Sequence, residues 1–178
     1  MRAAVTSTGQ ERHASRRAIL VDHARIQDAA EISGVLSANF SQRGLFQISA
    51  SRVSSTISDF VVARDRTGRI VGCAAVHRDG AGLAQLHSVA VLPGYQNADV
   101  GKRLISAAVQ SAASAGIKRL WGATEKPVYF AYYGFRPISR WRLPIRVLLR
   151  QLVKVLHQPV ARIPGLLFGR HTFMERHL

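Results

Sequence analysis

Residues 91–102 read Val91-Leu92-Pro93-Gly94-Tyr95-Gln96-Asn97-Ala98-Asp99-Val100-Gly101-Lys102. An apolar strand pattern runs through a Pro-Gly turn into a short polar loop, and a helical pattern follows the loop. The first amides of a helix have no partner within the helix, and the positive end of the helix dipole lies there. This stretch therefore predicts a phosphate-binding loop between a strand and a helix.

The patterns on both sides of this loop are regular. Residues 59–65 and 69–77 are rich in strand-forming side chains and are separated by Arg66-Thr67-Gly68, which predicts a hairpin. Residues 83–91 complete a meander. Residues 100–115 repeat apolar side chains at helical spacing and are followed by Gly116, a typical residue after a helix end. Three more segments are predicted as strands: residues 18–21, 119–124 and 172–176.

The loop resembles the acyl-CoA-binding motif of the GNAT family of N-acetyltransferases. In that motif a strand ending in Val-x-Pro precedes Gln or Arg, two residues, Gly, one residue, and Gly or Ala. Gln96 and Gly101 match, while Asp99 stands at the position of the first Gly. Residues 24–32 are similar to the family's opening helix, and residues 129–135 to its helix ending in Gly-Phe. The resemblance covers residues 18–138 and implies an α/β (α+β) GNAT fold: a mixed, mostly antiparallel sheet flanked by helices, with a C-terminal helical extension.

Composition agrees with one domain. The chain has 178 residues, of which 47% are apolar, enough to fill a core. We expect a basic, flexible arm over 1–17 and a single acetyltransferase domain over 18–178, including a basic helical extension at 139–171. The single cysteine, Cys73, predicts a packed thiol rather than a disulfide. No stretch has the roughly 18 apolar residues of a membrane span, and no apolar leader is visible, so we expect a cytoplasmic protein.

The net charge of +15 is concentrated near the C-terminus. Residues 144–157 predict a helix with a charged stripe of Arg146, Arg150 and Lys154, followed by a connector over 159–168. We favour a helix that packs on the sheet through an opposite apolar face, composed of Ile145, Leu148, Leu149, Leu152, Val153 and Leu156. Contact with an anionic membrane surface and a homodimer contact are the alternatives. The region lacks aromatic residues interleaved with its charges, which argues against nucleic acid.

The resemblance implies transfer of an acetyl group from acetyl-CoA, as cosubstrate, to the primary amine of a small amino-acid-like or other acceptor, without a metal. It places the backbone of Val89, Ala90 and Val91 on the pantetheine arm and the thioester carbonyl. It places the loop on the pyrophosphate, with the residues Gln96, Asn97, Ala98, Asp99, Val100, Gly101 and Lys102. The Asp99 carboxylate either repels phosphate or caps the helix itself.

Acyl transfer from a thioester to an amine needs a proton acceptor for the amine and a donor for the thiolate. Phe130 stands where many family members have an acid tyrosine, and Gln85 where relatives often have a glutamate. His87, two residues further on the same strand face, is the first candidate base, and Glu125 is the second. Tyr129 is a candidate acid, although helix geometry turns it about 100° from Phe130.

Within the family, three stretches between residues 44 and 75 look like amino-acid N-acetyltransferases of the N-acetylglutamate synthase type. That subgroup has Leu-Pro-Arg-Ser where this chain has Phe46-Gln47-Ile48-Ser49. Ile48 cannot pair with a carboxylate, so this position predicts a less acidic acceptor. Ile48 and Gln85 are the expected substrate-binding residues.

The departures from the family motifs leave a second hypothesis open. Asp99, Phe130 and Gln85 together could mark a family member that has lost turnover. Such a protein would bind acyl-CoA or a partner as a sensor or interaction module. Measurement of CoA binding beside acceptor-dependent CoA release distinguishes the two hypotheses.

Overall fold

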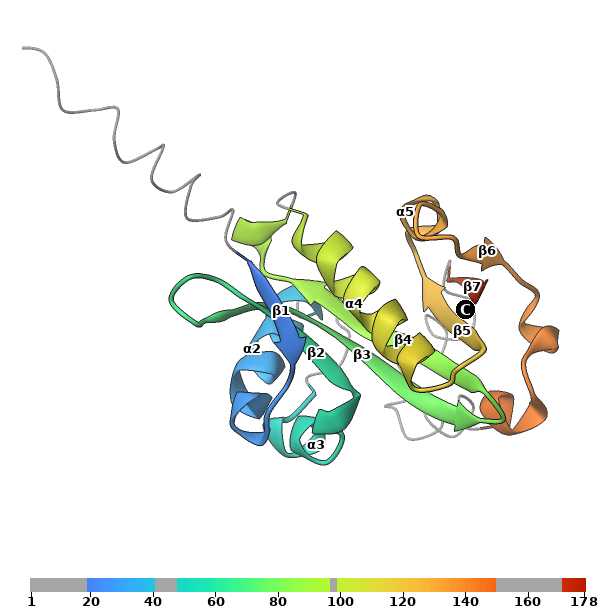
Figure 1. Cartoon of the computed structure of the whole chain (residues 1–178), viewed down its shortest axis with the longest axis horizontal. Helices are drawn as coiled ribbons and strands as arrows, with labels where there is room; N and C mark the ends of the chain where they lie inside the picture. The colour runs from blue at the N-terminus through green and yellow to red at the C-terminus, as the bar shows by residue number, and fades with distance from the viewer. Residues whose placement is uncertain (1–18, 41–47, 97–98, 150–170) are drawn as a thin grey trace, which may run out of the picture. The chain divides into compact units, whose positions relative to one another are not determined.

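The computed structural model describes residues 19–40, 48–96, 99–149 and 171–178 (Figure 1). Unit 1 comprises the described residues of 1–77 and 86–115, and unit 2 those of 78–85 and 116–178. The predicted arm over 1–17, the connector over 159–168 and most of the extension over 139–171 lie outside the described residues. A single domain over 18–178 stays a prediction.

Seven strands form a sheet in the order β1-β2-β3-β4-β5-β7-β6. In unit 1, β1 pairs with β2 and β2 with β3, both antiparallel. In unit 2, the β4–β5 pair is parallel, whereas β5–β7 and β6–β7 are antiparallel. The predicted mixed, mostly antiparallel sheet is confirmed. The strands are β1 (Leu20–His23), β2 (Phe60–Arg64), β3 (Ile70–Gly80), β4 (Leu83–Val91), β5 (Arg119–Thr124), β6 (Arg136–Pro137) and β7 (Thr172–His177).

Helices cover both faces of the sheet in unit 1. On β2 and β3, Phe60, Val62 and Cys73 share a core with residues of α2 and α3, while the neighbouring Gly72 lies against α4. A strand covered on both faces has no solvent side, so β2 is apolar from Phe60 to Ala63 rather than alternating. The helical elements of unit 1 are η1 (Ile26–Asp28), α2 (Ala29–Phe40), α3 (Ala50–Ser54), η3 (Ile57–Asp59), η4 (Pro93–Tyr95) and α4 (Val100–Ser114).

Unit 2 is built around Trp121 of β5. Its ring stacks on Phe173 of β7 with centroids 6.1 Å apart, and its indole N–H donates to the Asp79 carboxylate at 2.8 Å. Leu143 and Val147, four residues apart, pack into the same cluster. This arrangement satisfies the polar atom of a fully buried tryptophan and attaches the segment after β6 to the strands. The helical elements here are α5 (Pro127–Ala131), η5 (Arg140–Arg142) and a helix over residues 145–149.

Several predicted boundaries shift. The opening helix begins as η1 and continues as α2 to residue 40, beyond the predicted 24–32. The helix predicted over 129–135 is α5, which ends at Ala131 before Gly134 takes a φ of +78°. The predicted burial of Ile145 and Leu149 is wrong, because these side chains are 69% and 54% exposed and Val147 occupies the core instead. Among the described residues, no helix is long and apolar enough to cross a membrane.

Candidate active site

The backbone of strand β4 is irregular at Ser88, whose φ of +52° is rare for a residue with a side chain. The Ser88 carbonyl accepts a hydrogen bond from the Cys73 thiol, with 3.6 Å between sulfur and oxygen. Burial raises the pKa of the Cys73 thiol to about 12, so this group is a neutral donor and a packed side chain, as predicted. The irregular backbone lies directly before Val89, Ala90 and Val91, the predicted thioester contacts. Nothing in the sequence signals this feature, because serine rarely adopts such a φ.

His87 is held in place by its neighbours in unit 1. Its Nδ1 lies 2.9 Å from the Ser88 hydroxyl, and its ring meets the Phe60 ring edge-on with 6.3 Å between centroids. The side chain is half-buried. These contacts fix the orientation of the imidazole, which a general base requires.

The turn before the predicted phosphate-binding loop is braced by side chains. The Gln96 side-chain amide donates to the Val91 carbonyl at 3.1 Å and to the Asn39 side-chain oxygen at 3.4 Å. The Tyr95 hydroxyl donates to the Asp65 carboxylate at 2.8 Å. Gln96, expected to contact the pyrophosphate, thus also closes the turn onto the end of β4.

Asp65 lies in the β2–β3 turn and receives several hydrogen bonds. Burial alone would raise the pKa of its carboxyl. The bonds from the Thr67 hydroxyl, Tyr95 and the amides of Thr67 and Arg69 outweigh that effect and hold the pKa below its usual value. Asp65 therefore accepts from Tyr95 as a carboxylate, in the charged form that bonds most strongly.

Asp99 occupies the N-cap position of α4 with φ +57° and ψ +6°, the left-handed conformation that glycine adopts most easily. Aspartate tolerates this region better than most residues, which explains how it can replace the glycine of the motif. Its side chain makes no capping hydrogen bond, so the alternative in which Asp99 takes up the helix amides is wrong. The first-turn amides of Val100, Gly101 and Lys102 have no acceptor within α4.

The residues on either side of Asp99 complete the account of the loop. Asn97 and Ala98 lie outside the described residues. The neighbouring Arg103 donates to the Ile19 carbonyl at 3.1 Å, which ties α4 to the start of β1.

Ile48 packs against the core formed with α2 and α3, and its carbonyl accepts a hydrogen bond from the Ser33 hydroxyl at 2.6 Å. A contact with the acceptor substrate stays a prediction for this residue. Ser33 is a partner that the sequence did not indicate.

The other predicted residues lie in unit 2. Gln85 is 9% exposed. Glu125 follows β5, and its carboxylate lies 3.9 Å from the His171 imidazole, a neighbour that sequence reasoning missed. The Tyr129 ring meets the rings of Phe130 and Tyr133 edge-on, at 6.0 and 5.2 Å. Their catalytic and substrate roles stay predictions.

Phe130 stands where the family often has an acid tyrosine. Its ring meets Phe135 of the Gly-Phe pair edge-on with 5.6 Å between centroids. This position therefore contributes aromatic packing and no ionisable group.

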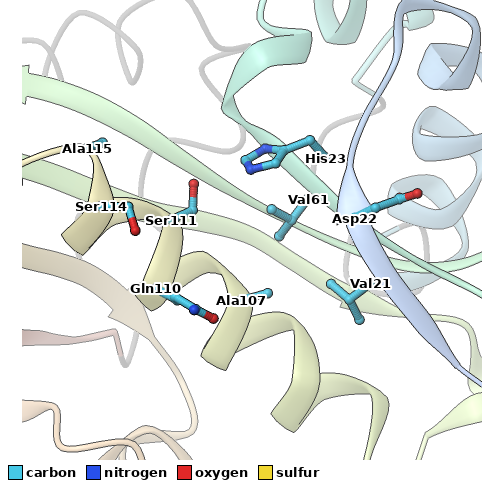
Figure 2. Close-up of a pocket in the computed structure, with 9 residues that line it drawn as sticks. All are labelled: Val21, Asp22, His23, Val61, Ala107, Gln110, Ser111, Ser114 and Ala115. Carbon is cyan, nitrogen blue, oxygen red and sulfur yellow. The ribbon is translucent and has the colours of Figure 1, made fainter.

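A hollow of about 460 Å³ lies in unit 1, between edge strand β1, β2 and the C-terminal half of α4 (Figure 2). None of its lining residues was predicted as a site residue: Val21, Asp22, His23, Val61, Ala107, Gln110, Ser111, Ser114 and Ala115. The predicted phosphate-binding loop is at the opposite end of α4, so this hollow is not the predicted cofactor site. In the described part of the chain, no three His, Cys, Asp or Glu side chains are grouped to hold a metal ion.

The sequence profile of the Acetyltransferase (GNAT) family matches residues 25–133. The chain belongs to the GNAT family. This match includes β4, the braced turn and α4, and it makes the protein an acyl-CoA-dependent N-acyltransferase of the GNAT type.

Individual relatives agree with this assignment. An uncharacterized N-acetyltransferase of Chlorobaculum tepidum is 27% identical over 127 residues, which cover 71% of this chain and 81% of the relative. An amino-acid acetyltransferase of Mycobacterium tuberculosis is 26% identical over 122 residues, covering 67% of this chain and 70% of the relative.

The fold is also that of a solved GNAT structure. The N-acetylglutamate synthase of Neisseria gonorrhoeae, complexed with coenzyme A and N-acetyl-glutamate, matches with a TM-score of 0.68 at 23% identity. The match covers 90% of this chain and 35% of the synthase. The predicted resemblance to amino-acid acetyltransferases of this type is confirmed.

Proposed function

We propose that this GNAT protein transfers the acetyl group of acetyl-CoA to the primary amine of a small amino-acid-like acceptor. The observation that carries the proposal is the sequence of features along β4 and α4. His87 is held beside an irregular backbone at Ser88, and the following loop leads to helix amides that Asp99 does not occupy. His87 is thus four residues before Val91, where the braced turn toward the proposed phosphate loop begins.

In the proposed reaction the amine nitrogen attacks the thioester carbonyl carbon, and backbone N–H groups of β4 stabilise the oxyanion. His87 accepts the proton that the amine loses. With Nδ1 protonated and donating to the Ser88 hydroxyl, Nε2 carries the lone pair for this transfer. The tetrahedral intermediate then collapses, the carbon–sulfur bond breaks and CoA leaves as a thiolate.

Protonation of the thiolate is the less demanding step. A free thiol has a pKa of about 8.5, so the thiolate can leave without a dedicated acid. Tyr129 is our candidate donor. We expect its hydroxyl to matter less than the His87 imidazole.

The acceptor is proposed from two relatives and from the residue at position 48. One relative is an amino-acid acetyltransferase, and the synthase of similar fold was solved with N-acetyl-glutamate. Ile48 replaces the arginine that this subgroup offers to an acidic acceptor. We therefore propose an acceptor with amino-acid character and less negative charge than glutamate.

The test uses the full chain, acetyl-CoA and a panel of amines grouped by charge, with the released thiol as the measured product. We expect His87→Ala to lower kcat by about a hundredfold or more with little change in the KM for acetyl-CoA. Ser88→Ala keeps the imidazole and removes its partner, so a smaller loss is expected. Glu125→Gln is the matched test of the second candidate base.

Two results would refute parts of this proposal. Binding of CoA without turnover on the whole panel would favour the non-enzymatic sensor. Unchanged kcat in His87→Ala together with a large loss in Glu125→Gln would move the base to unit 2.

A further inference from the structure

Unit 2 exposes three large apolar side chains within nine residues. Trp141 is 76% exposed, Ile145 69% and Leu149 54%. Ile145 and Leu149 are one helical turn apart, so they lie on one face of the helix over 145–149. Val147, which points the opposite way, is 2% exposed and packs with the Trp121 cluster. The segment is therefore attached to unit 2 on one side and apolar on the other.

Cations alternate with these apolar residues. Arg140, Arg142 and Arg146 are all exposed, and residues 136–149 contain no aspartate or glutamate. The Arg140 guanidinium lies 5.3 Å from the centre of the Trp141 ring. The Arg146 guanidinium lies against Gly80 at the end of β3, 3.6 Å from where a Cβ would stand. Arg142 lies near enough to Glu175 to help lower the pKa of that carboxyl, while Arg140 and Arg146 hold positive charge beside the exposed apolar side chains.

The six side chains Trp141, Ile145, Leu149, Arg140, Arg142 and Arg146 together form what we name the basic apolar surface. We propose that it binds anionic phospholipid membranes. Arginines attract lipid phosphates, tryptophan favours the membrane–water interface, and aliphatic side chains enter the acyl boundary. The combination of charge and aliphatic side chains is what such a boundary requires.

Two other occupants fit less well. A second copy of the chain would bring arginines against arginines, since residues 136–149 supply no acidic partner. A nucleic acid would satisfy the arginines but would leave Ile145 and Leu149 without an apolar environment. Anionic lipid is the partner that serves both kinds of side chain.

The chain carries its own reporter for this contact. It has two tryptophans, and Trp121 is fully buried while Trp141 is exposed. Mixing with vesicles that contain an anionic phospholipid should shift tryptophan emission to the blue and protect it from a soluble quencher, whereas zwitterionic vesicles should not. Trp141→Phe should remove the shift while the protein still sediments with the vesicles.

Paired variants separate the two contributions. Each cation near an anionic leaflet strengthens binding about fivefold, so Arg140→Gln with Arg146→Gln should weaken it by on the order of twenty-five-fold at low salt. Ile145→Ser with Leu149→Ser should abolish the binding that persists at physiological ionic strength. Leu20→Ser with Ile26→Ser is the matched apolar control in unit 1, because those side chains are 63% and 64% exposed.

Arg66→Gln with Arg69→Gln is the matched charge control, located in the β2–β3 turn. Thiol release with acetyl-CoA should stay unchanged in every variant, which verifies folding. Equal loss of vesicle binding in control and test pairs would overturn the proposal, since general positive charge would then explain it. Three other results would overturn it as well. They are the absence of a blue shift, a blue shift caused by RNA but not by vesicles, and self-association that is lost in the Ile145→Ser, Leu149→Ser variant.

Discussion

Substitution of Gly72 by alanine tests whether α4 packs on β3 as described. A Cβ at this position would lie 2.9 Å from Leu104 Cδ1, 3.0 Å from the Ala90 carbonyl oxygen and 3.2 Å from Val100 Cγ1. The leucine methyl can move, but the carbonyl belongs to the β4 backbone. Overpacking of this kind destabilises a protein by roughly 1–3 kcal/mol, reduced by about 0.4–1 kcal/mol because alanine restricts the unfolded chain.

Gly34→Ala is the matched control. Gly34 lies within α2, and a Cβ there would meet no atom within 4 Å. Alanine is more favourable than glycine inside a helix by up to about 1 kcal/mol, so this variant should be more stable than the wild type. The same substitution is thus expected to lower stability at Gly72 and to raise it at Gly34.

The Gly72 substitution should also affect catalysis. Val100 begins α4 and Ala90 lies in β4, two elements proposed to contact acetyl-CoA. We expect the KM for acetyl-CoA to rise severalfold in Gly72→Ala and to stay unchanged in Gly34→Ala. Stability is measured by urea unfolding followed by tryptophan fluorescence, and KM by thiol release. A Gly72→Ala protein at least as stable as the wild type would refute the described packing.

Three further predictions concern single contacts. Replacement of Asp99 by Gly should tighten acetyl-CoA binding a few-fold by removing a carboxylate near phosphate, and Asp99→Asn should do the same. Calorimetry measures both affinities. An affinity that improves only for glycine would assign the effect to the backbone conformation rather than to the charge. Tyr95→Phe removes the bond to Asp65, so the KM for acetyl-CoA should rise with kcat unchanged; equal losses in both parameters would contradict a positioning role. Burial would raise the pKa of Glu175, but two hydrogen bonds from Arg119 lower it below its usual 4.5. The ionised Glu175 therefore stabilises the folded state above that pH, and this stabilisation is lost as the pH falls through the lower native pKa. The melting temperature should therefore drop on acidification below about pH 4.5, and less steeply in Glu175→Gln, whereas parallel curves would exclude Glu175 as a cause.

Local pattern was sufficient for most of the elements. Strands β4 and β5 have the predicted bounds, because each is an apolar run between turn or polar residues. Helix α4 begins at Val100 as expected and ends just before Gly116, whose φ of +74° is the conformation that stops a helix. These features depend on residues close together in the chain, so periodicity and glycine placement report them.

The candidate site is only partly visible in the sequence. The motif identifies the loop and its helix, and the strand pattern places His87 beside it. The positive φ at Ser88, the left-handed backbone at Asp99 and the bond from Tyr95 to Asp65 have no pattern that predicts them. The bond from Tyr95 to Asp65 joins residues that are 30 positions apart along the chain, beyond the reach of a local pattern.

The helix over residues 145–149 is likewise predicted only in part by the sequence. Its apolar residues predict an amphipathic helix, but not which of them meet a neighbouring element. Because Leu143 and Val147 pack beside Trp121, the buried side of the helix passes through Val147, and Ile145 and Leu149 face away. Sequence periodicity determined that these segments form helices and strands around a loop that is predicted to bind phosphate. Only the tertiary contacts decided which side chains are buried, which polar groups are paired and which surface is left for a partner.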